Sequence, residues 1–166
     1  MLCILGCDPG LTGALALLEL DHDRRVLDLT IEDMPVTAVR VGRATRKLVE
    51  PAELCRLIRA FRPDAAYVEA VHSMPAQGVA SSFAFGMGFG VLRGVIAALG
   101  VPVTYVTPQE WMRIVRLGKG DDVARQRIKQ LMPDHAAWFP LKAHHGRADA
   151  ALIAMAGAQI EKHTGL

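Results

Sequence analysis

The chain has 166 residues and a formal net charge of +2, so any nucleic-acid interface must depend on local clusters of cations rather than on overall charge. This length can bury a core, and we expect residues 1–166 to form a single domain. Three cysteines without metal-ligand spacing, no signal-peptide pattern and apolar runs interrupted by charges indicate a reduced, cytoplasmic protein without membrane contact.

The first part of the chain is predicted to form three strands followed by a loop. Apolar, β-rich runs at about 2–7, 13–20 and 25–31 predict an antiparallel meander, with a Pro-Gly turn after the first run. The segment 37–50 has no clean period, and we interpret it as a basic loop. Its cations are Arg40, Arg43, Arg46 and Lys47.

The remainder alternates helices and strands. We expect strands at about 65–71 and 101–106, and helices at about 51–61, 82–99, 108–116, 121–132 and 146–162. Asp121 is the predicted cap of the fourth helix. This order predicts an α/β fold whose mixed central sheet combines the three-stranded antiparallel meander with parallel strands and is flanked by helices.

Three acids lie on otherwise apolar elements. Asp8 ends the first strand, Glu69 lies near the end of the fourth strand, and Asp149 lies in the last helix. Burying an unpaired carboxylate is costly, so such positions need an explanation. If the first and fourth strands are neighbours, the carboxylates converge at one edge of the sheet. Carboxylate oxygens suit Mg²⁺ or Mn²⁺, and the sequence therefore predicts a divalent-cation site.

A histidine pair precedes the last acid. His145 is four residues before Asp149, which places both on one face if the helix already exists at 145. His144 would then point about 140° away. His145 is thus the better candidate for the site, although a helix that began only at Arg147 would leave the choice open.

Each of these residues has an ordinary structural explanation as well. An Asp before Pro-Gly is a common turn residue, and Glu69 can be an ion-pair partner at a strand end. His145 can be a cap or surface residue, and Asp149 can pair with Arg147. The joint pattern favours the metal site, because all the ordinary explanations would have to hold together.

Four motifs in order resemble the RuvC-type Holliday-junction resolvases, of the RNase H-like (retroviral integrase) nuclease superfamily. They are "GCDPGLTGAL", "RPDAAYVEAV", "GMGFGVLRGVIAAL" and "RADAALIAMAG". The resemblance extends over nearly the whole chain and is weakest from 30 to 50.

This resemblance implies an RNase H-like fold and a homodimeric endonuclease that resolves four-way DNA junctions by paired nicks. It implies Mg²⁺ as the cofactor, with Mn²⁺ as a substitute, and Asp8, Glu69 and Asp149 as metal ligands. Two cations would activate a water and stabilise the leaving oxygen. The "GMGFGVLRG" helix is a candidate for the dimer contact, although it could equally pack inside the domain.

The chain departs from the family at three places. The family commonly has an acid, or His in some members, where this chain has Gly146, so the fourth catalytic and metal-binding role is assigned to His145, with His144 in reserve. Many relatives have an aromatic residue where this chain has His72, which stacks on a base less extensively. The segment 37–47 lacks the bacterial pattern, which makes a phage protein in a host cytoplasm, or another divergent member, plausible.

Two cation clusters are the candidate DNA contacts. The first is the predicted basic loop. The second surrounds Lys119, which Gly118 and Gly120 would allow to approach a phosphate backbone, and also contains Arg116. A solvated charged face is the alternative for the second cluster, because Asp121 and Asp122 dilute it.

Other functions are compatible with parts of the pattern. A sugar-kinase or actin-like ATPase also begins with an Asp-x-Gly hairpin, but it normally needs two such domains. A ribosomal-RNA processing nuclease of the same superfamily is a nearer alternative. A branched-DNA-binding protein with a decayed metal site is another, because Gly146 replaces a family ligand.

Overall fold

The computed structural model describes residues 1–70 and 78–164, and its centre is a five-stranded mixed sheet in the order β3-β2-β1-β6-β7. The strands are β1 (Leu2–Asp8), β2 (Ala14–Leu20), β3 (Val26–Asp33), β6 (Ala65–Glu69) and β7 (Val103–Val106). β1, β2 and β3 pair antiparallel, whereas β6 joins β1 and β7 joins β6 in parallel. The predicted α/β class, with a meander extended by parallel strands, is confirmed.

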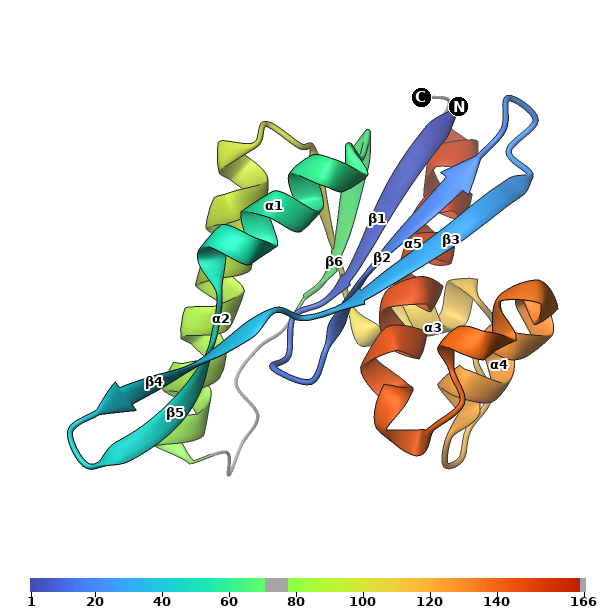
Figure 1. Ribbon diagram of the computed structural model, residues 1–166. Coiled ribbons are helices and arrows are strands. Elements are labelled where there is room, and N and C mark those ends of the chain that lie inside the picture. The colour runs from blue at the N-terminus through green and yellow to red at the C-terminus, as the bar shows by residue number, and fades with distance from the viewer. Residues whose placement is uncertain (71–77, 165–166) are drawn as a thin grey trace.

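Helices cover both faces of this sheet (Figure 1). One face carries α1 (Pro51–Phe61) and α2 (Val79–Ala98), and the other carries α3 (Pro108–Ile114), α4 (Val123–Leu131) and α5 (His145–Thr164). Two short 3-10 helices, η1 (Pro133–Trp138) and η2 (Lys142–His144), connect α4 to α5. Each face of the sheet therefore has its own hydrophobic core.

Helix α5 lies directly against the sheet. Its buried positions are mostly alanines, and Gly6 of β1 lies beneath it. A Cβ at Gly6 would overlap the Ala150 carbonyl oxygen and the Ala154 nitrogen, so only glycine allows this approach. The close contact sets the position of α5 relative to β1, and hence the position of Asp149 relative to Asp8.

The segment predicted as a basic loop is a β-hairpin, so that prediction is wrong. β4 (Val36–Val41) and β5 (Ala44–Val49) pair antiparallel as a separate two-stranded sheet. The turn between the two strands consists of Gly42 and Arg43. Gly42 has a φ of +61°, a conformation that glycine adopts without strain. In Figure 1 the hairpin projects away from the main sheet.

Some helix ends differ from the predicted ones. α2 begins at Val79 rather than at 82, and α5 begins at His145 rather than at 146. The N-cap of α4 is Asp122, not the predicted Asp121, and it has a left-handed backbone without a side-chain cap hydrogen bond. The three cysteines are free thiols, as the sequence predicted.

Candidate metal centre and nucleic-acid interface

Asp8 lies at the carboxyl end of β1, where the chain turns into β2. The Gly10 backbone N–H donates to Asp8 Oδ1 at 3.3 Å, and the Gly13 N–H donates to the Gly10 carbonyl at 2.9 Å. Burial raises the pKa of Asp8, while the Gly10 N–H and the nearby His145 oppose this rise. The turn therefore holds a partly buried carboxylate at the edge of the sheet.

The start of α5 brings two further candidate ligands to Asp8. Potential ligand atoms of Asp8, His145 and Asp149 all lie within 4.8 Å of one another. Because α5 begins at His145, that residue and Asp149 share one helix face, as the four-residue spacing requires. His145 is exposed, whereas the two acids are half-buried. The cluster is therefore open to solvent on the histidine side.

Gly146 lies too close to the β1–β2 turn to carry a side chain. A Cβ at this position would overlap the Thr12 carbonyl oxygen and would lie 2.8 Å from Gly13 Cα and 3.0 Å from Asp8 Oδ2. The backbone of the turn therefore excludes a side chain at the position where the resemblance led us to expect an acid. This packing explains why a fourth ligand in this chain would come from the neighbouring His145.

His144 has different surroundings from His145. It ends η2, and its Nδ1 accepts a 3.4 Å hydrogen bond from the Leu141 N–H. Partial burial and the charge of Arg147 lower the pKa of His144. Among the described residues, the metal-ligand cluster contains His145 and not His144.

Arg147 ties the first turn of α5 to the sheet. Its Nε and Nη2 donate to the two carboxylate oxygens of Asp33 at 2.6 and 2.7 Å, and its Nη1 donates to the Trp138 carbonyl at 3.3 Å. A bidentate arginine–carboxylate pair fixes orientation as well as distance. Arg147 therefore pairs with Asp33. The ordinary explanation of Asp149 as the ion-pair partner of Arg147 is thus not supported.

Glu69 ends β6, the parallel neighbour of β1. The Trp111 indole N–H donates to Glu69 Oε1 at 3.0 Å. Burial raises the pKa of Glu69, the Trp111 hydrogen bond opposes this, and the charge of Asp8 adds to the rise. Glu69 is therefore electrostatically coupled to the cluster, although it is not among the three residues with mutually close ligand atoms.

The electrostatics of the three acids fit a bound cation. Burial, followed by the charges of Asp8 and Glu69, raises the pKa of Asp149 to about 7. A divalent ion would stabilise the charged form of all three carboxyls and offset their burial. The carboxylates of this donor set are suited to hard divalent cations such as Mg²⁺ or Mn²⁺.

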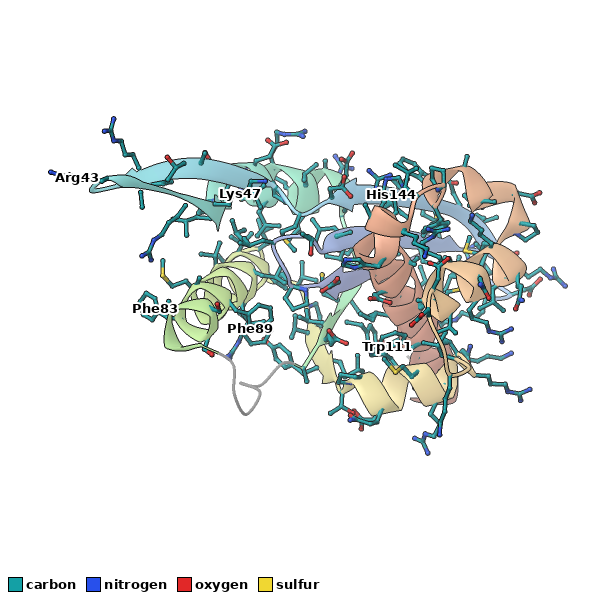
Figure 2. All side chains as sticks on the ribbon, turned by 90° about the horizontal axis from the view of Figure 1, so that it is seen from below. Arg43, Lys47, Phe83, Phe89, Trp111 and His144 are labelled. Atoms are coloured by element: carbon teal, nitrogen blue, oxygen red, sulfur yellow. The ribbon has the colours of Figure 1, made fainter. Side chains whose placement is uncertain are left out.

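The predicted DNA contacts lie on two separated elements. Arg40, Arg43, Arg46 and Lys47 are exposed on the β4–β5 hairpin, and Arg116 and Lys119 are exposed between α3 and α4. In Figure 1 these elements lie on opposite sides of the edge where β1 and β6 end. In Figure 2, Arg43 and Lys47 lie on the hairpin, away from Trp111 and His144. The predicted contact His72 lies outside the described residues.

Helix α2 exposes an apolar surface next to the hairpin. Phe83 is 66% exposed and Met87 is 42% exposed, and Figure 2 shows Phe83 at the outer side of the helix. A cavity of about 480 Å³ lies between α2 and residues 46–48 of β5. By length and composition alone, Ala80–Ala98 is long and apolar enough to cross a membrane, although the charge of Arg93 lies within it. Only 17% of this stretch is buried, and the buried part includes Leu92 and Ile96, which belong to the core that α2 shares with α1.

Trp111 is the site neighbour that sequence reasoning missed. Its helix follows β7, which pairs with β6, so the strand order places α3 beside Glu69. The Thr-Pro-x-Glu start of that helix is a readable capping signal. The sequence thus predicts the helix, but the hydrogen bond to Glu69 depends on the tertiary arrangement.

No protein-family model and no curated protein sequence matches the chain. Solved structures do match. The RuvC protein of Thermus thermophilus superimposes with a TM-score of 0.63 at 18% identity, over 99% of this chain and 97% of that chain. The same protein in complex with a Holliday junction substrate gives 0.62 at 17% identity, with the same coverage. The yeast mitochondrial Holliday junction resolvase Ydc2 gives 0.57 at 18% identity, over 96% and 80% of the two chains.

These matches establish the fold. The mixed sheet and its covering helices are those of RuvC, which confirms the predicted RNase H-like architecture.

Proposed function

We propose that this protein is a divalent-metal-dependent endonuclease that cuts four-way DNA junctions. The observation that carries the proposal is the cluster of Asp8, His145 and Asp149, with Glu69 beside it, at the edge of a sheet with the RuvC fold. A RuvC of this fold has been solved with a Holliday junction substrate. The presence of this donor set favours an enzyme over a relative with a decayed site.

The four side chains would hold Mg²⁺, with Mn²⁺ as a substitute. When bound, such ions lower the pKa of a water nucleophile and stabilise the negative charge that develops on the leaving oxygen. Asp8 and Asp149 supply carboxylate ligands from β1 and α5, and Glu69 supplies a third from β6. His145, on the exposed side of the cluster, would bind the cation or orient one of its ligands.

Cleavage of a labelled four-way junction, compared with linear duplex DNA, tests this function directly. We expect paired nicks in the junction with Mg²⁺, and a loss on the order of 1,000-fold in Asp8→Asn, since metal ions supply several kcal/mol of transition-state stabilisation. Asp23→Asn is the matched control, because Asp23 lies in the β2–β3 turn, at the opposite end of β2 from Ala14, which pairs with Asp8.

The outcomes separate the alternatives. Junction binding without cleavage in Mg²⁺ or Mn²⁺ would favour a decayed nuclease. Preferential cleavage of structured RNA would favour the processing nuclease of the same superfamily. Equal loss of cleavage in Asp8→Asn and Asp23→Asn would contradict the assignment of the site.

A four-way junction presents two equivalent strands for cutting, and a second copy of the chain would supply the second site. The exposed face of α2 is the candidate contact. It combines Phe83 and Met87 with Gly90 and Gly94, where a Cβ would meet nothing within the chain and another helix could approach closely. The reduced thiols support a cytoplasmic location for this dimer.

Sedimentation of Phe83→Asp tests the dimer. A charge on the apolar face should convert a micromolar dimer into a monomer, whereas Ala60→Glu on the exposed surface of α1 should not. A wild-type monomer under the same conditions would contradict the proposal. Flotation of the wild type with lipid vesicles would instead identify α2 as a membrane contact.

A further inference from the structure

Trp111 is connected to the proposed metal site through one hydrogen bond. Its side chain is only 1% exposed, and its indole N–H donates to Glu69 Oε1 at 3.0 Å. An indole N–H is a donor only, so its buried partner must be an acceptor. The second carboxylate oxygen of Glu69, Oε2, does not take part in this bond and can interact with another partner.

Helix α3 holds Trp111 at a defined position. The helix begins with a capping box, in which Thr107 Oγ1 accepts from the Glu110 N–H at 3.3 Å and Glu110 Oε2 accepts from the Thr107 N–H at 2.8 Å. Pro108 occupies the first turn, where its missing N–H costs nothing. Both features fix the start of the helix, only one turn before Trp111.

The sheet brings this helix to Glu69. In the parallel pairing of β6 and β7, Val106 is the register partner of Glu69, and the Ala70 N–H donates to the Val106 carbonyl at 2.7 Å. The chain leaves β7 at Val106 and enters α3 directly, so Trp111 turns back toward the end of β6. Helix α3 also packs with α5, which carries Asp149, and Trp111 belongs to the same core cluster as buried residues of α5.

We propose that Trp111 is a positioning residue whose indole N–H holds Glu69 Oε1 and thereby orients Oε2 toward the cation. This inference rests on the proposed metal-dependent function and adds a residue to it. Hydrogen-bond partners of metal ligands typically account for 10–100-fold in metal affinity. Trp111 has this role without itself touching the ion or the substrate.

The first experiment is calorimetric titration of Mg²⁺ into Trp111→Phe. Phenylalanine fills much of the same space but has no N–H, so we expect binding about 10–100-fold weaker than in the wild type. Phe139→Leu is the matched control, because Phe139 is a fully buried aromatic residue of the same core cluster. Its change should lower the melting temperature without changing Mg²⁺ affinity.

A double-mutant cycle separates positioning from general packing. In the Glu69→Ala background, Trp111→Phe should have no further effect on Mg²⁺ affinity, because the group that it orients is absent. Equal losses in both backgrounds would show that Trp111 acts through packing alone and would overturn the inference.

A spectroscopic measurement on the folded wild-type side chain keeps the test independent of the variant's stability. The chain has two tryptophans, so Trp138→Phe leaves only the Trp111 indole signal. We expect that N–H resonance to be protected from exchange and to shift on Mg²⁺ titration, with the dissociation constant found by calorimetry. A resonance that Mg²⁺ does not move would overturn the inference.

The measurements distinguish a failure of the proposed metal site from a failure of the proposed role of Trp111. A wild type that binds no Mg²⁺ or Mn²⁺ removes the metal site and the role of Trp111 together. A wild type that binds Mg²⁺ as tightly as Trp111→Phe leaves the metal-dependent function standing and removes only the positioning role.

Discussion

The acidic edge of the sheet and the arm formed by the β4–β5 hairpin with α2 are built in opposite ways. At the acidic edge, β1 and α5 approach so closely that Gly6 and Gly146 cannot accept a Cβ. Along the arm, Gly86, Gly90 and Gly94 have open space around them, and Phe83 is largely exposed. The groups that we propose to hold an ion lie where packing leaves no freedom, whereas the arm presents surface that the described residues of the chain do not cover.

A glycine-to-alanine exchange in each region gives the largest contrast. Gly146→Ala should lower cleavage at least about 100-fold and destabilise the fold by about 1–3 kcal/mol, because its Cβ displaces the turn that carries Asp8. Gly86→Ala places its Cβ in open space on a helix and should stabilise that helix by about 1 kcal/mol. Junction cleavage and thermal melts measure both effects, and similar losses at the two positions would contradict the comparison.

The histidine pair sharpens the comparison within the acidic edge itself. His145→Ala removes one of the three clustered candidate ligands and should weaken Mg²⁺ binding by about 10–100-fold, with a parallel loss of cleavage. His144→Ala removes only a 3.4 Å contact with the Leu141 backbone and should change both by less than about threefold. A larger effect at His144 would reverse the assignment of the fourth ligand.

At the two exposed cation clusters, one on the arm and one between α3 and α4, charge rather than packing should determine the effect of a substitution. Arg43→Ala and Lys119→Ala should each weaken junction binding modestly and reduce the slope of log affinity against log salt by about 1. Melting temperatures should stay unchanged, because both side chains are exposed. Arg25→Ala, in the exposed β2–β3 turn, is the control. An unchanged salt slope in Arg43→Ala would exclude the hairpin tip from the DNA interface.

The smallest expected effect is the pH dependence of the melting temperature, which depends on Asp149 at the acidic edge. The pKa of Asp149 is raised from 3.8 to about 7, so the folded state holds a proton that the unfolded state releases in this range. Stability from this group is therefore present at low pH and falls as the pH rises toward 7. Without metal, Asp149→Asn should melt above the wild type at pH 7.5 by several degrees, and less so at pH 5.

Metal addition completes that measurement. Mg²⁺ should raise the melting temperature of the wild type more at pH 7.5 than at pH 5, because only the charged carboxyls bind it well. Equal stabilisation at both pH values, or in Asp149→Asn, would contradict a cation bound at this edge.

The sequence predicted the sheet, most of the helices and their order, because β1 and β2 are continuous apolar runs and α1 repeats its apolar residues at helical spacing. The hairpin was missed because its cations masked two short strands. Gly42-Arg43 between them is a two-residue turn signal that could have identified it. From the sequence, Gly146 could be interpreted only as the absence of an expected acidic ligand. The reason for the glycine, contact with the Thr12 carbonyl, depends on how the turn packs against α5.

The location of the candidate ligands also determines when they can first come together. Asp8 comes from β1, the first strand, whereas His145 and Asp149 come from α5, the last helix, which packs against β1 and β2. During synthesis, the donors from β1 and β6 therefore emerge from the ribosome long before those from α5. Such sequence-distant contacts also slow folding, because the intervening chain must be ordered first. A partly synthesised chain would thus have no complete cation site, and any nuclease activity would begin only after α5 has docked.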